Sequence, residues 1–441
     1  MIWTEADTGL LLRLLRLPTA GPLEAPDGAA PSALGEAQLV YAQAAAALGL
    51  EIVRHAPASA TDIAGDDTPL AVRRAAAAPG FLTSQPSLVL RLGPPLPPAA
   101  TVMFNVHLDT VAGGPWPRSG DGRVAGRGAI DAKGPAVALL AGVRAAIAAQ
   151  PLLGASVGVL IQAVAGEEGG AMGSIGTRPL VRLGYTGRLN LFCEPTGLRY
   201  LPRATAAATA RVYVQGRDSV DDRPGQGHNA SVLLGFLTQH LAAELSRTAS
   251  RERRGDRACV AGLSTGLTHN KVHGSGQLLV NLPYACAADG ARAVRALEEA
   301  LRSGLALFAR RFAPLQEYAL TAADAAAITR LEWLKRSLPT LAGEDDAEME
   351  SVLASVGLAR WPDDEPAFTC DAIWMDGVPD AYTVVFGPGD LAANQAHAPG
   401  EFATVTELDE FAAAVCRILL GFTAHRVRSQ GWERKGTRCP S

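Results

Sequence analysis

The chain has 441 residues, of which 48% are hydrophobic, and it exceeds the size at which one hydrophobic core normally keeps growing. Its net charge of -4 excludes the basic footprint of a nucleic-acid-binding protein, and no apolar run approaches the roughly 20 residues that span a bilayer. Six cysteines without a CxxC pair are typical of thiols in a reducing compartment. We therefore expect a cytoplasmic protein of two domains that acts on a small molecule or peptide, away from membranes.

The first part of the chain alternates between predicted helices and strands. It begins with an amphipathic helix within residues 1–21, and not with a signal peptide, because Glu5 and Asp7 precede the apolar stretch. Further elements follow in chain order: a helix over 36–48 and strands over 50–55, 87–92 and 101–106. This alternation is typical of an α/β fold.

Four strand-like segments each lead to a candidate metal ligand. They are TVMFNV before His107, ASVGVLIQAVAG before Glu167 and Glu168, RLNLF before Glu194, and AYTVVF shortly before His397. Open α/β sheets place their ligands at the carboxyl ends of the strands. The order of elements therefore predicts a site at one edge of a sheet.

A different pattern occupies residues 205–322. It reads as a strand at 210–216, a helix at 229–245, strands at 259–265 and 277–285, a helix at 291–312 and a last strand at 316–322. We interpret this segment as an inserted α+β lid or dimerisation domain, which divides a catalytic domain into residues 1–204 and 323–441. The basic tail at 426–441 is predicted to be a disordered end.

The segment FNVHLDTVAGGPW holds His107 and Asp109 at an H-x-D spacing, in which the imidazole binds a metal and the aspartate orients the other ring nitrogen. Asp131 follows in GRGAIDAKG, where a carboxylate after a glycine-rich approach can bridge two cations. Taken alone, a histidine at a strand end is more often a core residue, and such an aspartate is usually an N-cap. The two features acquire functional meaning only in combination with the acidic residues that follow.

The tandem acids Glu167 and Glu168 in AVAGEEGGAMGSIG are the most telling feature, because adjacent carboxylates at an apolar strand end repel one another without a cation. A solvated charge pair is the alternative, and the preceding strand argues against it. With a metal present, Glu168 can be a ligand while Glu167 takes a proton from the metal-bound water, first as general base and then as general acid.

Glu194 in NLFCEPTG and His397 in NQAHAPGE complete two ligand sets around the bridge. Carboxylate and imidazole ligands without thiolates suit zinc, with cobalt and manganese as possible substitutes. We expect two zinc ions per chain.

The motifs HLDTV, GRGAIDAKG, GEEGG, CEPT, FGPGD and HAPGE together resemble those of the di-zinc metallopeptidase family of acetylornithine deacetylase, succinyl-diaminopimelate desuccinylase, aminoacylase and glutamate carboxypeptidase. The resemblance covers nearly the whole chain. It implies an α/β, zinc-peptidase-like catalytic domain with a mixed sheet flanked by helices, together with an inserted α+β lid through which two copies form a homodimer. The matching positions imply that His107 and Glu194 hold one zinc, Glu168 and His397 the other, Asp131 bridges them, and Glu167 is the catalytic base.

The lid departs from the family pattern at the position of a histidine that stabilises the oxyanion. In the run GRDSVDDRPGQGHNA this position falls on Val220, which cannot donate a hydrogen bond. Losing one oxyanion donor can cost about 10²–10³ in rate, so another group must serve or hydrolysis is impaired. The candidate substitutes are His228, His269 and His273. Asn270, in THNKV, resembles a lid residue that contacts substrate in relatives.

A second departure lies in LLVNLPY, where Asn281 stands at the place of an arginine that grips the substrate carboxylate in a bidentate fork. Recognition of a free amino-acid carboxylate is therefore in doubt. The arginines that could compensate are Arg203, Arg211, Arg217 and Arg223.

These observations predict a di-zinc amidohydrolase that cleaves an amide bond of an N-acyl amino acid or small peptide-like substrate by metal-activated water. One alternative is a carboxypeptidase or dipeptidase of the same family. A second is a non-hydrolytic metal-binding homologue with a degenerate lid, against which the retention of Glu167 argues.

Overall fold

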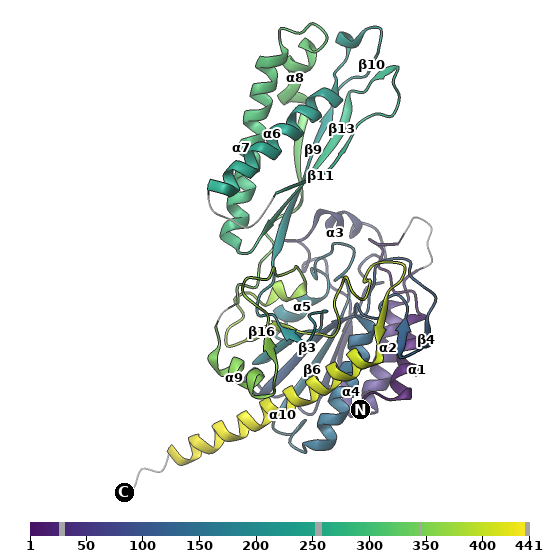
Figure 1. Cartoon of the computed structure of the whole chain (residues 1–441), viewed down its shortest axis with the longest axis vertical. Coiled ribbons are helices and arrows are strands. Elements are labelled where there is room, and N and C mark those ends of the chain that lie inside the picture. Colours follow the sequence, from purple (N-terminus) through teal and green to yellow (C-terminus); the bar gives the residue numbers. More distant parts are fainter. Residues whose placement is uncertain (26–30, 252–257, 344, 437–441) are drawn as a thin grey trace. The chain divides into compact units, whose positions relative to one another are not determined.

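The chain divides into two units in the computed structural model (Figure 1), which describes residues 1–25, 31–251, 258–343 and 345–436. Unit 1 comprises Met1–Gly65, Ala71–Ala204 and Leu341–Ser441. Unit 2 comprises Asp66–Leu70 and Thr205–Thr340.

A six-stranded mixed sheet forms the centre of unit 1, in the order β1-β2-β6-β3-β7-β16. Its strands are β1 (Leu50–Ala56), β2 (Ser87–Leu92), β3 (Thr101–His107), β6 (Gly158–Val164), β7 (Leu189–Phe192) and β16 (Tyr382–Val385). The pairs β1–β2 and β2–β6 are antiparallel, whereas β6, β3, β7 and β16 run parallel to their neighbours. The predicted mixed sheet flanked by helices is confirmed.

Helices cover both faces of this sheet, as the alternation of side chains along β6 shows. Ile161 and Ala163 point into a large core shared with α1 (Glu5–Leu15), α2 (Leu34–Ala46), α4 (Lys133–Ala149) and α10 (Val405–Gly436). Val164 packs instead against Leu180 of α5 (Thr177–Arg182). Because successive side chains of a strand point to opposite faces, α5 lies on the other side of the sheet.

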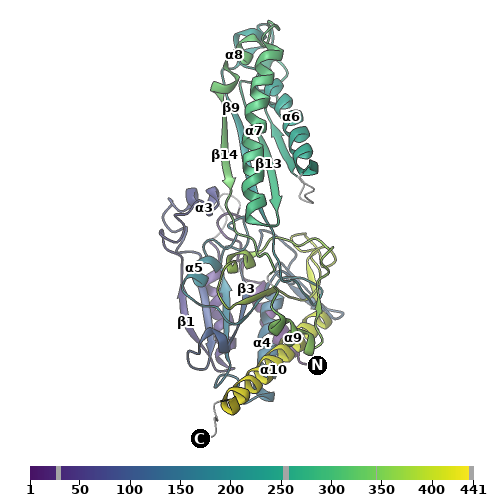
Figure 2. The same cartoon turned by 90° about the vertical axis from the view of Figure 1, so that its left-hand side faces the viewer.

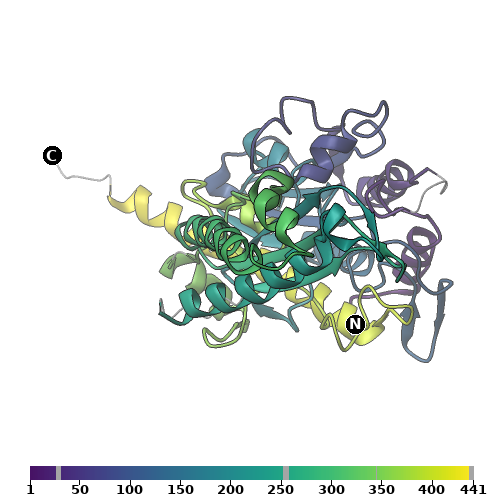
Figure 3. The ribbon, with the colours of Figure 1, turned by 90° about the horizontal axis from the view of Figure 1, so that it is seen from above.

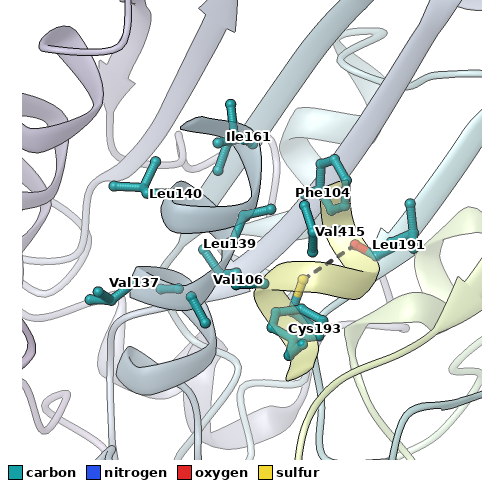
Figure 4. Packing of buried hydrophobic residues seen from close by; sticks show 14 of the residues in the cluster. Phe104, Val106, Val137, Leu139, Leu140, Ile161, Leu191, Cys193 and Val415 are labelled. Atoms are coloured by element: carbon teal, nitrogen blue, oxygen red, sulfur yellow. Dashed lines mark hydrogen bonds between the residues drawn. The ribbon is translucent and has the colours of Figure 1, made fainter. Parts of the chain in front are cut away.

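The large core depends on close packing between α4, α10 and the sheet. Figure 4 shows Phe104 and Val106 of β3 next to Val415 of α10 and Leu139 of α4. A Cβ atom added to Gly142 of α4 would lie 2.5 Å from the carbonyl oxygen of Ala412, so only glycine allows the two helices this approach. Helix α4 is apolar and buried around most of its circumference, as expected for a helix enclosed by a core.

Several short elements complete unit 1. They are α9 (Ala347–Ser355), η1 (Pro98–Ala100), η3 (Asp371–Met375), the three-stranded sheet of β4 (Arg118–Gly120), β5 (Arg123–Ala125) and β17 (Phe402–Thr404), and the pair β8 (Arg199–Tyr200) with β15 (Ala359–Arg360). Helix α3 (Leu70–Ala75) begins at the last residue of the Asp66–Leu70 segment of unit 2.

Unit 2 is an antiparallel sheet in the order β11-β13-β9-β14 with helices packed on one face (Figure 2). Its strands are β9 (Ala206–Gln215), β11 (Cys259–Ser264), β13 (Ser275–Tyr284) and β14 (Thr329–Lys335), and its helices are α6 (Ala230–Arg251), α7 (Ala287–Phe312) and α8 (Ala319–Ile328). Alternate residues of β9 and β13 are buried beneath the helices, while those between them are half-buried on the open face. A separate antiparallel pair is formed by β10 (Ser219–Val220) and β12 (Lys271–Val272), and η2 (Pro224–Gln226) follows β10.

The strand predicted at 316–322 is wrong, because residues 316–318 form a turn and helix α8 begins at Ala319. The alternation in this short run is outweighed by the alanine-rich residues that follow, which favour a helix. The last strand of the unit 2 sheet is β14, which pairs with β9. Unit 2 therefore extends to Thr340, beyond the boundary at residue 322 that the sequence suggested.

The disordered end predicted at 426–441 is wrong for residues 426–436, which continue helix α10. This segment contains arginine, glutamine, glutamate and lysine, all good helix formers, and no proline occurs before Pro440. Figures 1 and 3 show the last turns of α10 running beyond the rest of unit 1. Residues 437–441 lie outside the described part of the chain.

Within the described residues, no helix combines the length and apolar character needed to cross a bilayer. The five cysteines in this part of the chain, Cys193, Cys259, Cys286, Cys370 and Cys416, are free thiols. Cys439 lies outside it.

Candidate metal centre

The predicted ligands lie at the carboxyl ends of parallel neighbouring strands. Strand β3 ends at His107, the loop after β6 carries Glu167 and Glu168, Glu194 follows β7, and the loop after β16 leads to His397. Because β6, β3, β7 and β16 are consecutive in the sheet, these ends meet at one edge.

The structure brings all five candidate ligands together. Nε2 of His107 lies 2.9 Å from Oδ1 of Asp131 and 3.6 Å from Oε1 of Glu194. Nε2 of His397 lies 3.0 Å from Oδ2 of Asp131 and 2.9 Å from Oε1 of Glu168. Asp131 therefore stands between two imidazoles, with one carboxylate oxygen facing each.

Asp109 contacts different partners from those that the H-x-D spacing suggested. Nδ1 of His107 lies 2.9 Å from the main-chain carbonyl oxygen of Asp109 and 3.9 Å from its carboxylate. The carboxylate instead accepts hydrogen bonds from the main-chain N–H groups of Gly166, at 3.0 Å, and Glu168, at 3.1 Å. The main-chain oxygen thus holds the imidazole, while the side chain holds the loop that carries Glu167 and Glu168.

Glu401 is a site residue to which the sequence assigned no role, although it ends the HAPGE motif. Its carboxylate is fully buried and accepts hydrogen bonds from the main-chain N–H groups of Gly128, at 2.9 Å, and Asp131, at 3.4 Å. Arg127 donates to the same carboxylate at 2.6 Å and to the carbonyl oxygen of His397 at 3.2 Å. Glu401 and Arg127 together connect the loop of Asp131 to the loop of His397.

Asp371, at the start of η3, is a second buried carboxylate that sequence reasoning missed. Thr177 Oγ1 donates a hydrogen bond to its Oδ2 at 2.6 Å. Burial raises the pKa of Asp371 to about 7, although the Thr177 hydrogen bond acts in the opposite direction. Neither a predicted strand nor a recognised motif preceded this residue, so the sequence offered no signal for it.

The cluster holds more negative charge than its two imidazoles balance. Burial, and then the neighbouring carboxylates, raise the pKa values of Glu167 and Glu194 well above the ordinary range. Hydrogen bonds to Asp131 and then Glu168 raise the pKa of His397 to about 10. Burial acts to raise the pKa of Asp131, but the hydrogen bonds from the two histidines lower it. Bound divalent cations would balance this surplus of negative charge.

The lid position of Val220 is exposed and lies beside other candidate residues of unit 2. Val220 on β10 pairs with Lys271 on β12, which directly follows His269 and Asn270. His269 and Asn270 are exposed. Nε2 of His273, the next residue but one after Lys271, lies 3.1 Å from Thr268 Oγ1.

His228, a candidate to replace the missing histidine, is engaged within the lid. It is 4% exposed, and its Nδ1 accepts the main-chain N–H of Arg217 at 2.8 Å. Its Nε2 lies 3.1 Å from Oδ2 of Asp324. Both ring nitrogens therefore have partners inside unit 2, which favours a structural role for this residue.

The predicted substrate residues Asn281 and Arg203 also have partners of their own. Oδ1 of Asn281, on β13, accepts a hydrogen bond from Thr209 at 2.9 Å. Arg203, in unit 1, donates to the carbonyl oxygens of Pro362, at 2.7 Å, and Glu365, at 2.8 Å. The Arg203 contacts favour a role in holding this loop, and its part in substrate binding stays a prediction.

A model of one protein family, described as peptidase family M20/M25/M40, matches residues 103–421. This span contains the five candidate ligands and Glu167. The chain belongs to this family. No curated protein matches the sequence of this M20/M25/M40 peptidase.

Solved structures share the fold over nearly the whole chain. Aminopeptidase PepT from Bacillus cereus is 17% identical, with a TM-score of 0.66 and coverage of 95% of this chain and 98% of its own. Human carnosine dipeptidase 1 is 14% identical, with a TM-score of 0.61 and coverage of 95% and 97%. The YXEP protein of Bacillus subtilis is 10% identical, with a TM-score of 0.58 and coverage of 96% and 98%.

Family membership confirms the predicted reaction class, a metal-dependent hydrolase acting on amide or peptide bonds. A cluster of His107, Asp131 and Glu168, whose ligand atoms lie within 4.8 Å of one another, is suited to hold a metal ion. The non-hydrolytic alternative is not favoured.

Proposed function

We propose that this M20/M25/M40 peptidase hydrolyses an amide bond of an N-acyl amino acid or small peptide with two zinc ions. His107 and Glu194 would hold one ion, Glu168 and His397 would hold the other, and Asp131 would be shared between the two. The observation that carries the proposal is the placement of Asp131, whose two oxygens lie 2.9 Å and 3.0 Å from two different imidazoles. A carboxylate shared in this way is what a bridging ligand requires.

The donors fit this assignment. Two imidazoles and three carboxylates, with no thiolate among them, suit zinc, and a deficit of positive charge favours binding of divalent cations. The YXEP protein, which shares the fold, is described as a dinuclear metal binding peptidase, and this supports a site for two ions.

Glu167 is the proposed general base and then general acid. When bound, the metal ions supply a water of lowered pKa and polarise the carbonyl group of the substrate. Glu167 stands next to the ligand Glu168, and the pKa of its carboxyl group is raised by burial and by its neighbours. A carboxylate with a raised pKa accepts a proton from the attacking water more readily, and it then delivers that proton to the leaving nitrogen.

We propose that residues of the lid determine which substrates are hydrolysed. Asn281 is neutral and its oxygen already accepts a hydrogen bond from Thr209, so it supplies no positive charge to a free carboxylate. This favours N-acyl substrates whose recognition does not depend on that carboxylate. PepT and carnosine dipeptidase 1 are named as an aminopeptidase and a dipeptidase, which supports small peptides as the second substrate class. Asn270, exposed next to β12, is the lid residue that we propose to contact substrate.

We also propose a homodimer formed through unit 2. Strand β11 is at the edge of its sheet and is largely exposed, so its main-chain groups are available to a second copy. Leu263 of this strand and the nearby Leu267 are exposed hydrophobic side chains. Analytical ultracentrifugation at several concentrations tests this, and a monomer throughout contradicts it.

The central proposal is tested by elemental analysis of the purified protein, together with amide hydrolysis before and after chelation and zinc restoration. We expect about two zinc ions per chain, as for other two-metal hydrolases, and turnover that follows the metal. Asp131→Asn is expected to lose both metal and turnover, whereas the control Asp380→Asn, at an exposed loop position, keeps both. Full turnover by metal-free protein contradicts the proposal.

A further inference from the structure

The loop that carries Glu167 and Glu168 has a backbone that needs support from elsewhere. Met172 adopts φ 55° and Gly173 φ 62°, both in the left-handed region. For a residue with a side chain, such as Met172, this conformation is disfavoured and persists only where surrounding contacts hold it. At the near end of the loop, the carboxylate of Asp109 holds the N–H groups of Gly166 and Glu168.

At the far end, the turn η3 (Asp371–Met375) supplies the contacts that hold this backbone. The indole N–H of Trp374 donates a hydrogen bond to the main-chain oxygen of Met172 at 2.6 Å. Trp374 is 8% exposed, so water cannot readily replace this bond. The acceptor belongs to the residue with the left-handed backbone.

Two further contacts fix the turn against the same loop. Asp371 accepts the hydrogen bond from Thr177, where the loop enters helix α5. A Cβ atom added to Gly173 would lie 2.3 Å from Oδ1 of Asp371, so the turn and the loop are in direct contact there. The guanidinium of Arg178 lies 4.8 Å from the centre of the Trp374 ring and donates to the carbonyl oxygen of Asp62. The indole is therefore itself held in place.

We propose that Trp374 is a positioning residue for hydrolysis, which acts through its hydrogen bond to Met172 to hold the loop of Glu167 and Glu168. This inference rests on the proposed function of those two residues. Between the Asp109 anchor at Gly166 and Glu168 and the η3 anchor at Met172 to Thr177, the loop is closed by its own hydrogen bond from the N–H of Gly173 to the carbonyl oxygen of Gly166, at 2.8 Å. Loss of the Trp374 bond removes the hydrogen-bond donor that η3 supplies to the left-handed residue Met172, so that the backbone next to Glu167 and Glu168 can shift.

The chain offers a matched control. Trp361 also has a buried indole nitrogen, but that nitrogen makes no hydrogen bond within the described part of the chain. Its ring packs on Arg199, at 4.1 Å from the guanidinium carbon. Trp374→Phe therefore removes a hydrogen bond to the Glu167 loop, whereas Trp361→Phe makes the same change without removing one.

The experiment measures kcat and KM of both variants at saturating zinc, and zinc affinity by competition with a chelator, at a temperature well below unfolding. For Trp374→Phe we expect kcat to fall about 10- to 100-fold with KM nearly unchanged, because misplacing a catalytic group by about 1 Å has an effect of this size. Zinc affinity is expected to fall about 10-fold, since Glu168 moves with the loop. Trp361→Phe should match the wild type.

Thermal unfolding of the two tryptophan variants, together with kinetics of a third variant, distinguishes a positioning role of Trp374 from an effect on stability alone. Thr177→Val removes the hydroxyl group that binds Asp371 and should lower kcat in the same direction as Trp374→Phe. A Trp374→Phe protein with a lower melting temperature but wild-type kcat and zinc affinity overturns the proposal. If the wild type itself hydrolyses no amide, the proposed function fails. Zinc affinity then decides the role of Trp374, because weakening in Trp374→Phe alone supports it and equal affinity in both variants overturns it.

Discussion

The candidate metal cluster of unit 1 and the candidate substrate residues of the unit 2 lid differ in how their polar side chains are paired. In the cluster, each imidazole lies within reach of two carboxylates, so the charge of each group depends on its neighbours for balance. On the lid, the corresponding candidates are either exposed, as Val220 and Asn270 are, or satisfied by a neighbour, as Asn281 is by Thr209. Charged groups that depend on one another in this way indicate a site that needs a ligand. Residues whose hydrogen bonds are satisfied within the lid can be exchanged without disturbing such a site.

The largest effect on turnover is expected for Glu167→Gln, which keeps the shape of the side chain and removes its ability to transfer a proton. We expect kcat to fall by about 10²–10⁴ while zinc content stays at the wild-type level, because Glu167 is not among the ligands. Steady-state kinetics combined with elemental analysis measures both. If this variant loses zinc, and its turnover falls only in proportion to the zinc lost, Glu167 is a ligand and not the base.

The second test concerns the pH dependence of stability in the chelated protein. Burial raises the pKa of Asp371 from 3.8 to about 7 and that of Asp109 to about 6. Between pH 4 and 7 the native state therefore binds more protons than the unfolded state, so the free energy of unfolding falls as pH rises. For Asp371 alone the loss is on the order of 4 kcal/mol.

Thermal unfolding from pH 4.5 to 7.5 with excess chelator measures this loss, and Asp371→Asn should reduce it. Zinc-loaded protein is the control, since metal affinity increases as its ligands lose protons and should reverse the trend. A chelated protein whose melting temperature rises across this interval would contradict the charge description of the cluster.

A smaller effect is expected for His228→Ala in the lid. The buried imidazole loses its hydrogen bonds with Arg217 and Asp324, which should lower the free energy of unfolding by about 1–3 kcal/mol. The value of kcat should stay near that of the wild type, in contrast to His107→Ala, which removes a proposed ligand. A large fall in kcat without loss of stability would make His228 the substitute oxyanion donor.

The smallest effect is expected for Val220→Ala. The side chain is 53% exposed, so the free energy of unfolding should change by no more than about 0.5 kcal/mol. The value of kcat should be unchanged, because a valine donates no hydrogen bond. A marked loss of activity would show that this position acts on the substrate through packing.

The gathering of the candidate metal ligands at one edge of the sheet was predictable where a buried strand runs into a polar side chain. His107, Glu194 and the Glu167–Glu168 pair all follow this pattern, which combines the period of a strand with a chemical discontinuity. Glu401 lies in a loop and Asp371 at the start of the short turn η3, both without periodicity in the sequence. Their importance comes from contacts with Gly128, Asp131 and Thr177, which are distant in the chain. Such contacts leave no local trace in the sequence.

Elements of the fold were likewise predictable where the local sequence determines them, and not where contacts between distant residues do. Strands β1, β2 and β3 were predicted nearly to the residue, because their apolar runs are short and bounded by turns, whereas the segment predicted at 155–166 extends beyond both ends of β6. Helix α8 was read as a strand, because a short alternating run near Tyr318 resembles one. Strand β14 forms one edge of the unit 2 sheet by pairing with β9, which lies more than a hundred residues earlier in the chain.

The arrangement of the proposed ligands along the chain has a consequence for synthesis. His107, Asp131, Glu168 and Glu194 are synthesised before the segment Thr205–Thr340 of unit 2, whereas His397 is synthesised after it. A nascent chain can therefore offer a partial, strongly acidic pocket for many residues before its last imidazole emerges, and domains generally form as units during synthesis. Under the proposed assignment, retention of a second ion would therefore report that the parts of unit 1 before and after the insertion have folded together.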